Sequence, residues 1–444
     1  HRDLQSFPAR RSSDLSPGSG AVVTQPWRFG GKIKLTPASA LMEQVDFNYG
    51  SDADAIKLNG TAELRFGAQP RFNGVLSARQ IDLDKFSGES GEAVRSPPAA
   101  AIRRMIASAS AAFKPPFPIQ LGVGIDLVTR GGTDLQNLRG DISSAPGGWT
   151  LDRFEFRAPG LTDVRLSGRL GIQPSGVAFT GPADIASNDP NVLAAWLEGR
   201  KDAGRAPPRP LRVRGDITLS NEKIAIERLN ASFNRGPVNG RFVYDFGNTG
   251  GGRVEAILSA PELDIDAVSA FGKALLAGST AERPREVALS LDIGRASYAG
   301  IEAGKTNVKL QYDAKGLKIE QLSVDNFGGA NLTANGQIAL TPVPHGSVVL
   351  GFDARDLSGV NAILGRYMPQ LADRLRVVAP ALAPARLQAT LKLDDDKAGN
   401  MAALDVSGTA GGMRVSLNGE GVADLAALNL SSFRMLGQID ANDA

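Results

Sequence analysis

The sequence predicts a mainly β protein: an elongated, curled antiparallel β-sheet groove of repeated hairpins, with short helices inserted between them. Three observations support this fold class. Segments such as "NLTANGQIAL" at residues 331–340 alternate apolar and polar residues with the period of a half-buried strand. A glycine recurs at the same place in several of these segments. Short amphipathic stretches between the segments predict helices that lie against the sheet.

The recurring glycine stands where the alternation calls for an apolar side chain. In residues 331–340, Leu332 and Ile338 share a face with Gly336. The equivalent glycines, with an apolar neighbour on the same face, are Gly60 with Leu58, Gly168 with Leu166, Gly240 with Phe242, and Gly419 with Leu417. A glycine inside a strand marks a bulge, a bend or a close approach of another backbone.

Two interpretations of these glycines stay open. They let the sheet curl toward its apolar face, or they make room for a neighbouring helix or strand. If they curl the sheet, all of them lie on its concave side. The predicted groove-lining residues are then Leu58, Gly60, Leu166, Gly168, Gly240, Phe242, Leu332, Gly336, Ile338, Leu417 and Gly419.

An aspartate follows each glycine at a similar distance, just before an apolar run. These residues are Asp82, Asp264, Asp356 and Asp440, whereas the segment after Gly168 carries Asp184 and Asp189 instead. An aspartate in this position predicts a turn or a helix N-cap rather than catalysis, and the same holds for the neighbouring Asp84. We expect the inserted helices within residues 97–113, 189–200, 266–278 and 359–375.

The repeats divide the chain into segments of unequal length. We expect four β-repeats with helical inserts at residues 21–115, 116–205, 206–282 and 283–380, and a truncated fifth repeat at 381–444. The opening "HRDLQSFPARRSSDL" resembles translated sequencing adaptor, so residues 1–20 are interpreted as an artefact or, alternatively, a disordered basic arm. We therefore interpret the chain as a fragment that is truncated at both ends.

The composition excludes several kinds of active site. The net charge of +2 gives no electrostatic argument for nucleic acid, and the absence of Cys excludes thiolate metal ligands. Of the two histidines, only His345 lies outside the suspect opening, where a surface turn is expected. The phosphate-loop-like "AGIEAGKT" at residues 299–306 leads into an alternating segment rather than a helix, which argues against a nucleotide site. We expect no enzyme activity, no cofactor and no metal.

The phrase "FGGANLTANGQIAL", the glycine-centred hairpins and the "QIDLDKF" type of turn into a helix resemble the AsmA-like family of bacterial envelope proteins. The similarity covers residues 21–444. The resemblance implies a periplasmic body with an apolar β-groove and an inner-membrane anchor that this sequence lacks. It further implies a role in outer-membrane assembly, with phospholipid as the bound or transported partner and other protein partners unknown.

Two alternatives remain at this stage. The chain is a structural or interaction β-repeat scaffold at the cell envelope without lipid transport. Independently of that choice, the same apolar residues form a closed core between sheet and helices rather than an open groove.

Overall fold

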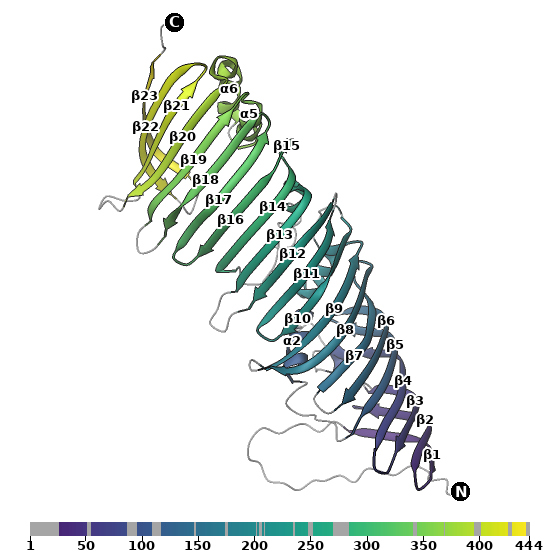
Figure 1. Ribbon diagram of the computed structural model, residues 1–444. Helices are drawn as coiled ribbons and strands as arrows, with labels where there is room; N and C mark the ends of the chain where they lie inside the picture. Colours follow the sequence, from purple (N-terminus) through teal and green to yellow (C-terminus); the bar gives the residue numbers. More distant parts are fainter. Residues whose placement is uncertain are drawn as a thin grey trace. The chain divides into compact units, whose positions relative to one another are not determined.

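The computed structural model describes residues 26–440 apart from 51–54, 87–95, 109–116, 146–147, 174–175, 201, 204–206, 208, 234–235, 247–251, 270–283, 341–343, 368, 395–400 and 425–428 (Figure 1). Of these residues, 70% are strand and 14% helix. The 23 strands belong to one mixed sheet that is not closed into a barrel. The prediction of a mainly β protein with short inserted helices is confirmed. The opening segment at residues 1–20 lies outside the described residues.

The chain divides into two compact units. The N-terminal unit comprises residues 1–226 and 273–281, and the C-terminal unit comprises residues 227–272 and 282–444. The elements of the N-terminal unit are β1 (Trp27–Leu35), β2 (Ser39–Tyr49), β3 (Ile56–Arg65), β4 (Arg71–Asp82), α1 (Leu83–Phe86), α2 (Pro98–Ser108), β5 (Ile119–Arg130), β6 (Thr133–Ala145), β7 (Gly148–Ala158), β8 (Thr162–Gln173), β9 (Gly176–Ser187), α3 (Pro190–Leu197) and β10 (Leu211–Ser220).

The next strand, β11 (Lys223–Phe233), includes the boundary between the units. The elements of the C-terminal unit are β12 (Gly236–Asp245), β13 (Arg253–Asp264), a helical segment at residues 265–269, β14 (Glu286–Tyr298), β15 (Ile301–Ala303), β16 (Thr306–Asp313), β17 (Gly316–Phe327), β18 (Ala330–Ala339), β19 (His345–Ala354), α5 (Ser358–Tyr367), α6 (Pro369–Leu382), β20 (Ala385–Asp394), β21 (Met401–Ala410), β22 (Met413–Asp424) and β23 (Asn429–Asp440). The β16 strand begins at Thr306, so no helix follows the phosphate-loop-like segment. His345, expected in a turn, is the first residue of β19.

Strands pair with their neighbours in chain order, and most pairs are antiparallel. The prediction of an antiparallel sheet is wrong for two of them: β4 pairs with β5, and β13 with β14, in parallel. A parallel pair needs a connection that returns the chain to the starting edge of the sheet. Residues 83–118 and 265–285 provide these connections, and each begins with a helix. At these two places the next strand therefore runs in the same direction as the one before it, whereas α3 and the α5–α6 pair connect antiparallel strands.

The first helix after β4 and the helix after β9 begin where the aspartates predicted them to begin. The Asp82 carboxylate accepts hydrogen bonds from the backbone N–H groups of Asp84 and Lys85, at 3.1 and 3.0 Å. Asp189 caps α3 by accepting from the N–H groups of Asn191 and Val192. Such bonds satisfy N–H groups that have no partner inside the helix. Capping is confirmed at both positions.

The second aspartate of the "DLD" segment has a different role. Asp84 is 4% exposed, and its carboxylate accepts from the N–H groups of Gly131 and Gly132 at 2.9 and 2.7 Å, with the Arg130 guanidinium at 3.3 Å. These residues form the turn between β5 and β6. The prediction that Asp84 is a cap is wrong, because the parallel β4–β5 pair places the end of β4 beside that turn.

The C-terminal unit repeats this arrangement. Asp264 accepts from the Ala267 N–H at 2.8 Å, as a cap does. Asp266, two residues later, accepts from the Ala299 N–H in the turn after β14, and from Arg366 of α5, both at 2.6 Å. In each unit, the first aspartate therefore starts a helix and the second binds the first hairpin turn after the parallel connection.

The helices cover one border of the apolar sheet face in each unit. In the N-terminal unit, Trp196 of α3 packs with Ile81 and Val128, and its Nε1 donates to the Arg130 carbonyl at 2.9 Å. In the C-terminal unit, Leu375 and Leu382 of α6 pack against a buried cluster that comprises Ala330, Ala354, Leu357, Ala385, Ala410 and Val415. The closed core predicted as an alternative therefore exists, but along this border.

The recurring glycines lie against the backbone of the next strand. A Cβ added at Gly168 meets the Thr180 carbonyl oxygen at 2.3 Å, and one at Gly336 meets the Ser347 carbonyl oxygen at 2.2 Å. Their φ angles of +156° and +145° are also ones that L side chains rarely adopt. Gly60 and Gly240 show the same collision with β4 and β13. Of the two interpretations, close approach of a neighbouring strand accounts for these positions.

Candidate functional site

The candidate site is one apolar face of the sheet, which we define by strand register. Residues that pair across neighbouring strands point to the same side. In the N-terminal unit, Gly60 pairs with Leu76. The row then continues through Val123, Gly140, Phe154, Leu166, Ala183 and Gly215, from β5 to β10. Every member of this row is apolar or glycine.

The C-terminal unit has a face built in the same way. One row starts at Gly240 and runs through Leu258, Leu291, Val308, Leu322, Ala334, Leu350, Ala389, Val406, Leu417 and Gly437. A neighbouring row starts at Phe242 and runs through Ala256, Leu289, Leu310, Ile319, Gly336, Val348, Leu391, Leu404 and Gly419. We call these surfaces the apolar face of each unit.

Away from the helices, the apolar face is open. Leu350 lies on β19, which pairs with β18 on one side and β20 on the other, and its side chain is 41% exposed. Tyr312 of β16 is 43% exposed. In the N-terminal unit, Ile172 near the end of β8 is 72% exposed. Large apolar side chains in mid-sheet are normally covered by a second layer. Among the described residues, no such layer lies over these positions.

The predicted groove residues all lie on these apolar faces. Leu58 and Leu166 are half-buried and also touch the cluster that α3 covers. Leu332 and Ile338 flank Gly336 on the same side of β18, with pairing partners Val324 and Leu317. The structure thus brings the predicted residues of each unit onto one surface; that they line a groove for lipid stays a prediction.

The opposite face of the sheet carries charged and polar side chains. Asp184 receives hydrogen bonds from Arg212 at 2.8 Å and from Arg214 at 3.2 Å. The hydrogen bonds from Arg212 hold the pKa of Asp184 below its ordinary value, and Arg214 acts in the same direction. In the C-terminal unit, a carboxylate off the sheet is affected in the same way: hydrogen bonds from Arg366 and then from the Ala299 N–H lower the pKa of Asp266, in the helical segment after β13.

These pKa shifts predict a loss of stability in acid. A carboxylate whose folded-state pKa is lowered stabilises the fold above its unfolded pKa of about 3.9 and loses that contribution as the pH falls through the lower value. We expect the melting temperature to be constant from pH 7 to 5 and to fall below about pH 4. The Asp184→Asn variant should show a smaller fall than the native chain, and equal falls would contradict this assignment.

Two further features concern the part of the chain that the structure describes. There, no group of three or more His, Cys, Asp and Glu side chains is placed to hold a metal ion. Nor does any helix in the described ranges have the length and hydropathy needed to cross a membrane. The candidate site therefore rests on surface character and extent rather than on a constellation of reactive groups.

Sequence reasoning missed most members of the apolar face. Leu310, Tyr312 and Leu350 were not among the predicted residues, although each alternates with polar neighbours in its own segment. That alternation was the available signal, and the strand register was needed to join the segments.

No protein-family model, no curated protein and no solved structure matches the chain.

Proposed function

We propose that this chain is a non-catalytic, AsmA-like envelope-biogenesis protein that holds or conducts phospholipid along its apolar sheet face. One observation carries the proposal: rows of apolar side chains cross strand after strand, and away from the helices most of them are only half-buried, with Leu350 41% exposed in mid-sheet. In this proposal the body lies in the bacterial periplasm, with an inner-membrane anchor outside this sequence, and lipid moves toward the outer membrane.

The energetics of acyl chains favour such a surface. Exposing a buried CH₂ group to water costs about 0.8 kcal/mol, so a lipid in transit needs an apolar partner along its whole path. An extended face supplies that partner without a specific pocket and without a reactive group. Aliphatic and phenylalanine side chains and glycines make up the rows, so no polar group on them opposes the acyl chain.

The alternative is a β-repeat scaffold that binds another protein through the same face. Large exposed apolar patches mark protein interfaces as well as lipid sites. The regular charged face opposite would suit either role. The two functions differ in whether lipid accompanies the purified protein.

Mass spectrometry of lipids that co-purify with the full chain tests the proposal. We expect phospholipid with the native chain and a severalfold lower lipid-to-protein ratio in Leu350→Asp, because a carboxylate on the apolar face opposes acyl-chain contact. Ile257→Asp is the matched control, since Ile257 is 50% exposed in the same unit but alternates onto the opposite face.

The control should carry as much lipid as the native chain, with similar circular dichroism for both variants. Absence of phospholipid from the native chain, or equal lipid loss in the two variants, would favour the scaffold.

A further inference from the structure

The N-terminal unit has a basic cleft at the strand ends that bear no helices. The cleft encloses about 1010 Å³ at the turn between β3 and β4. Its lining residues are Ala38, Arg65, Phe66, Ala68, Gln69, Pro70, Arg71, Asn73, Phe117, Pro118, Gln120, Ser143, Ser144 and Thr150. Two arginines and several amides and hydroxyls line it, and no Asp or Glu is among these residues.

The two arginines are placed as an anion site requires. Arg65 and Arg71 pair across the β3–β4 hairpin, so their side chains project from directly opposite positions. Like charges in such positions repel each other; the Glu63 carboxylate, which interacts with both arginines, offsets part of that repulsion, and a phosphate between them would offset the rest. Glu63 binds Arg65 through Nε at 2.9 Å, which orients the guanidinium and leaves its two Nη groups for another acceptor. Paired guanidinium groups suit a phosphate, which accepts several parallel hydrogen bonds.

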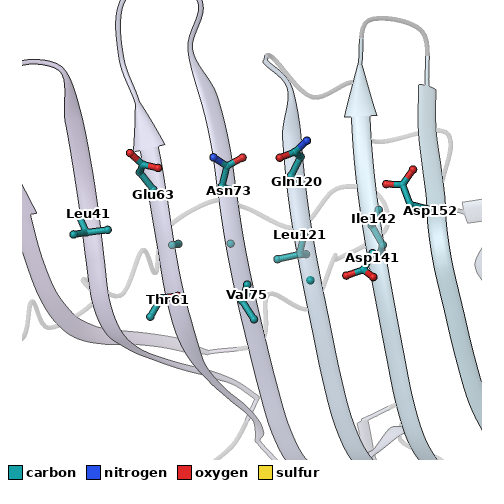
Figure 2. A pocket seen from close by; sticks show the side chains of 13 residues that line it. Leu41, Thr61, Glu63, Asn73, Val75, Gln120, Leu121, Asp141, Ile142 and Asp152 are labelled. Atoms are coloured by element: carbon teal, nitrogen blue, oxygen red, sulfur yellow. The ribbon is translucent and has the colours of Figure 1, made fainter.

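A second cleft, of opposite charge, adjoins the first. It encloses about 460 Å³ and contains the side chains of Glu63, Asp141 and Asp152 (Figure 2). Asn73 and Gln120 line both clefts and lie side by side on β4 and β5. Figure 2 shows Glu63, Asn73 and Gln120 in a row across three strands, with Asp141 and Asp152 on the two strands beyond. Arg153 lies close enough to Asp141 to interact electrostatically with it, so the acidic cleft is partly neutralised.

We infer that these two clefts together bind a phosphate ester that also carries an ammonium group. The phosphate lies between Arg65 and Arg71, and the ammonium extends over Asn73 and Gln120 toward the carboxylates. This inference rests on the proposed function, because such an ester is the headgroup of a zwitterionic phospholipid. By register Glu63, Asn73 and Gln120 lie on the charged face, so the lipid would pass around the β3–β4 turn, with its headgroup on one face and its acyl chains on the apolar face. Phe66 and Phe117 form an apolar wall of the basic cleft, which suits the glycerol end of an acyl chain.

A cleft in the C-terminal unit has a related composition. It encloses about 720 Å³ at the start of β19, and its polar lining includes Lys318, Glu320, Gln337 and His345. In both units the cleft lies at the turn of the hairpin whose second strand precedes the inserted helices, β4 in one case and β19 in the other. Each cleft thus has at least one cationic and one amide side chain in its lining, and a glutamate pairs with a cation in both places: Glu320 with Lys318 and Glu63 with Arg65.

Equilibrium binding of short-chain lipids to the full chain tests the inference. The probes are monomeric dihexanoyl phosphatidylethanolamine, dihexanoyl phosphatidylglycerol and dihexanoylglycerol, with phosphoethanolamine and inorganic phosphate as soluble arms. We expect the ethanolamine lipid to bind most tightly. Arg71→Gln should weaken both phospholipids about tenfold, the loss of one charge-assisted hydrogen bond, and leave dihexanoylglycerol unchanged.

Two matched variants complete the experiment. Arg79→Gln removes another exposed arginine of β4 outside the clefts and should change nothing. Asp141→Asn should abolish the preference for ethanolamine over glycerol headgroups.

Unchanged phospholipid affinity in Arg71→Gln would overturn the inference while the proposed function stands. Failure of all three lipids to bind would overturn the proposed function as well. Inorganic phosphate that binds as tightly as the phospholipids would overturn the lipid headgroup and leave a site for soluble phosphate.

Discussion

Replacing Gly168 with alanine is expected to destabilise the N-terminal unit by on the order of 3 kcal/mol. The added Cβ would lie 2.3 Å from the Thr180 carbonyl oxygen and 2.9 Å from the Gly181 Cα, so the backbones of β8 and β9 must separate. The φ of +156° adds strain for any L residue. Urea unfolding followed by tryptophan fluorescence measures the effect, because Trp149 pairs with Leu170 beside this position.

Gly171 in the same strand provides the matched control. A Cβ at Gly171 meets nothing within 4 Å, so Gly171→Ala should change stability by no more than about 0.5 kcal/mol. Both variants remove a glycine from β8, and Gly171 has neither the collision nor the positive φ, so the comparison isolates the two local demands for glycine at position 168. Equal effects of the two substitutions would show that close approach of β9 is not what requires glycine at position 168.

Replacing Asp84 with alanine is expected to cost on the order of 3–5 kcal/mol, as removal of one partner from a buried ion pair does. The change removes the acceptor for the Gly131 and Gly132 N–H groups and the carboxylate beside Arg130. The Trp196 indole, which donates to the Arg130 carbonyl, makes fluorescence a local reporter of this turn.

The control for Asp84 is its neighbour Asp82. Asp82→Ala removes a helix cap at a half-buried position and should cost about 1 kcal/mol. If Asp84→Ala proves no more costly than Asp82→Ala, the carboxylate of Asp84 does not hold the β5–β6 turn against α1.

Local alternation was enough to predict the strands, their apolar sides and the capped helix starts. The direction of β5 relative to β4 could not be predicted, because it depends on where residues 83–118 return the chain to the sheet. The role of Asp84 depends on the same event: the "DLD" segment says nothing about a turn that lies more than forty residues later in the sequence.

The glycine positions were found from sequence, but their cause was not decided there. Gly336→Val, which follows naturally from the idea of a curled groove, does not separate curling from close packing. Its Cβ would meet the Ser347 carbonyl oxygen at 2.2 Å whatever the sheet's curvature. The basic cleft was missed altogether, since Gln120 joins Asn73 only through the parallel pairing of β4 and β5.

The pairing of strands with their chain neighbours also bears on how this molecule forms. Hairpins close short loops at small entropic cost, so each antiparallel group can assemble from its own local sequence. The parallel pairs β4–β5 and β13–β14 are different, because the connecting segments must fold back before any ladder bond between the strands can form. The antiparallel groups would then form separately, and the two parallel pairs would form last. A chain that stops before either parallel pair forms would expose an unpaired strand edge to other molecules.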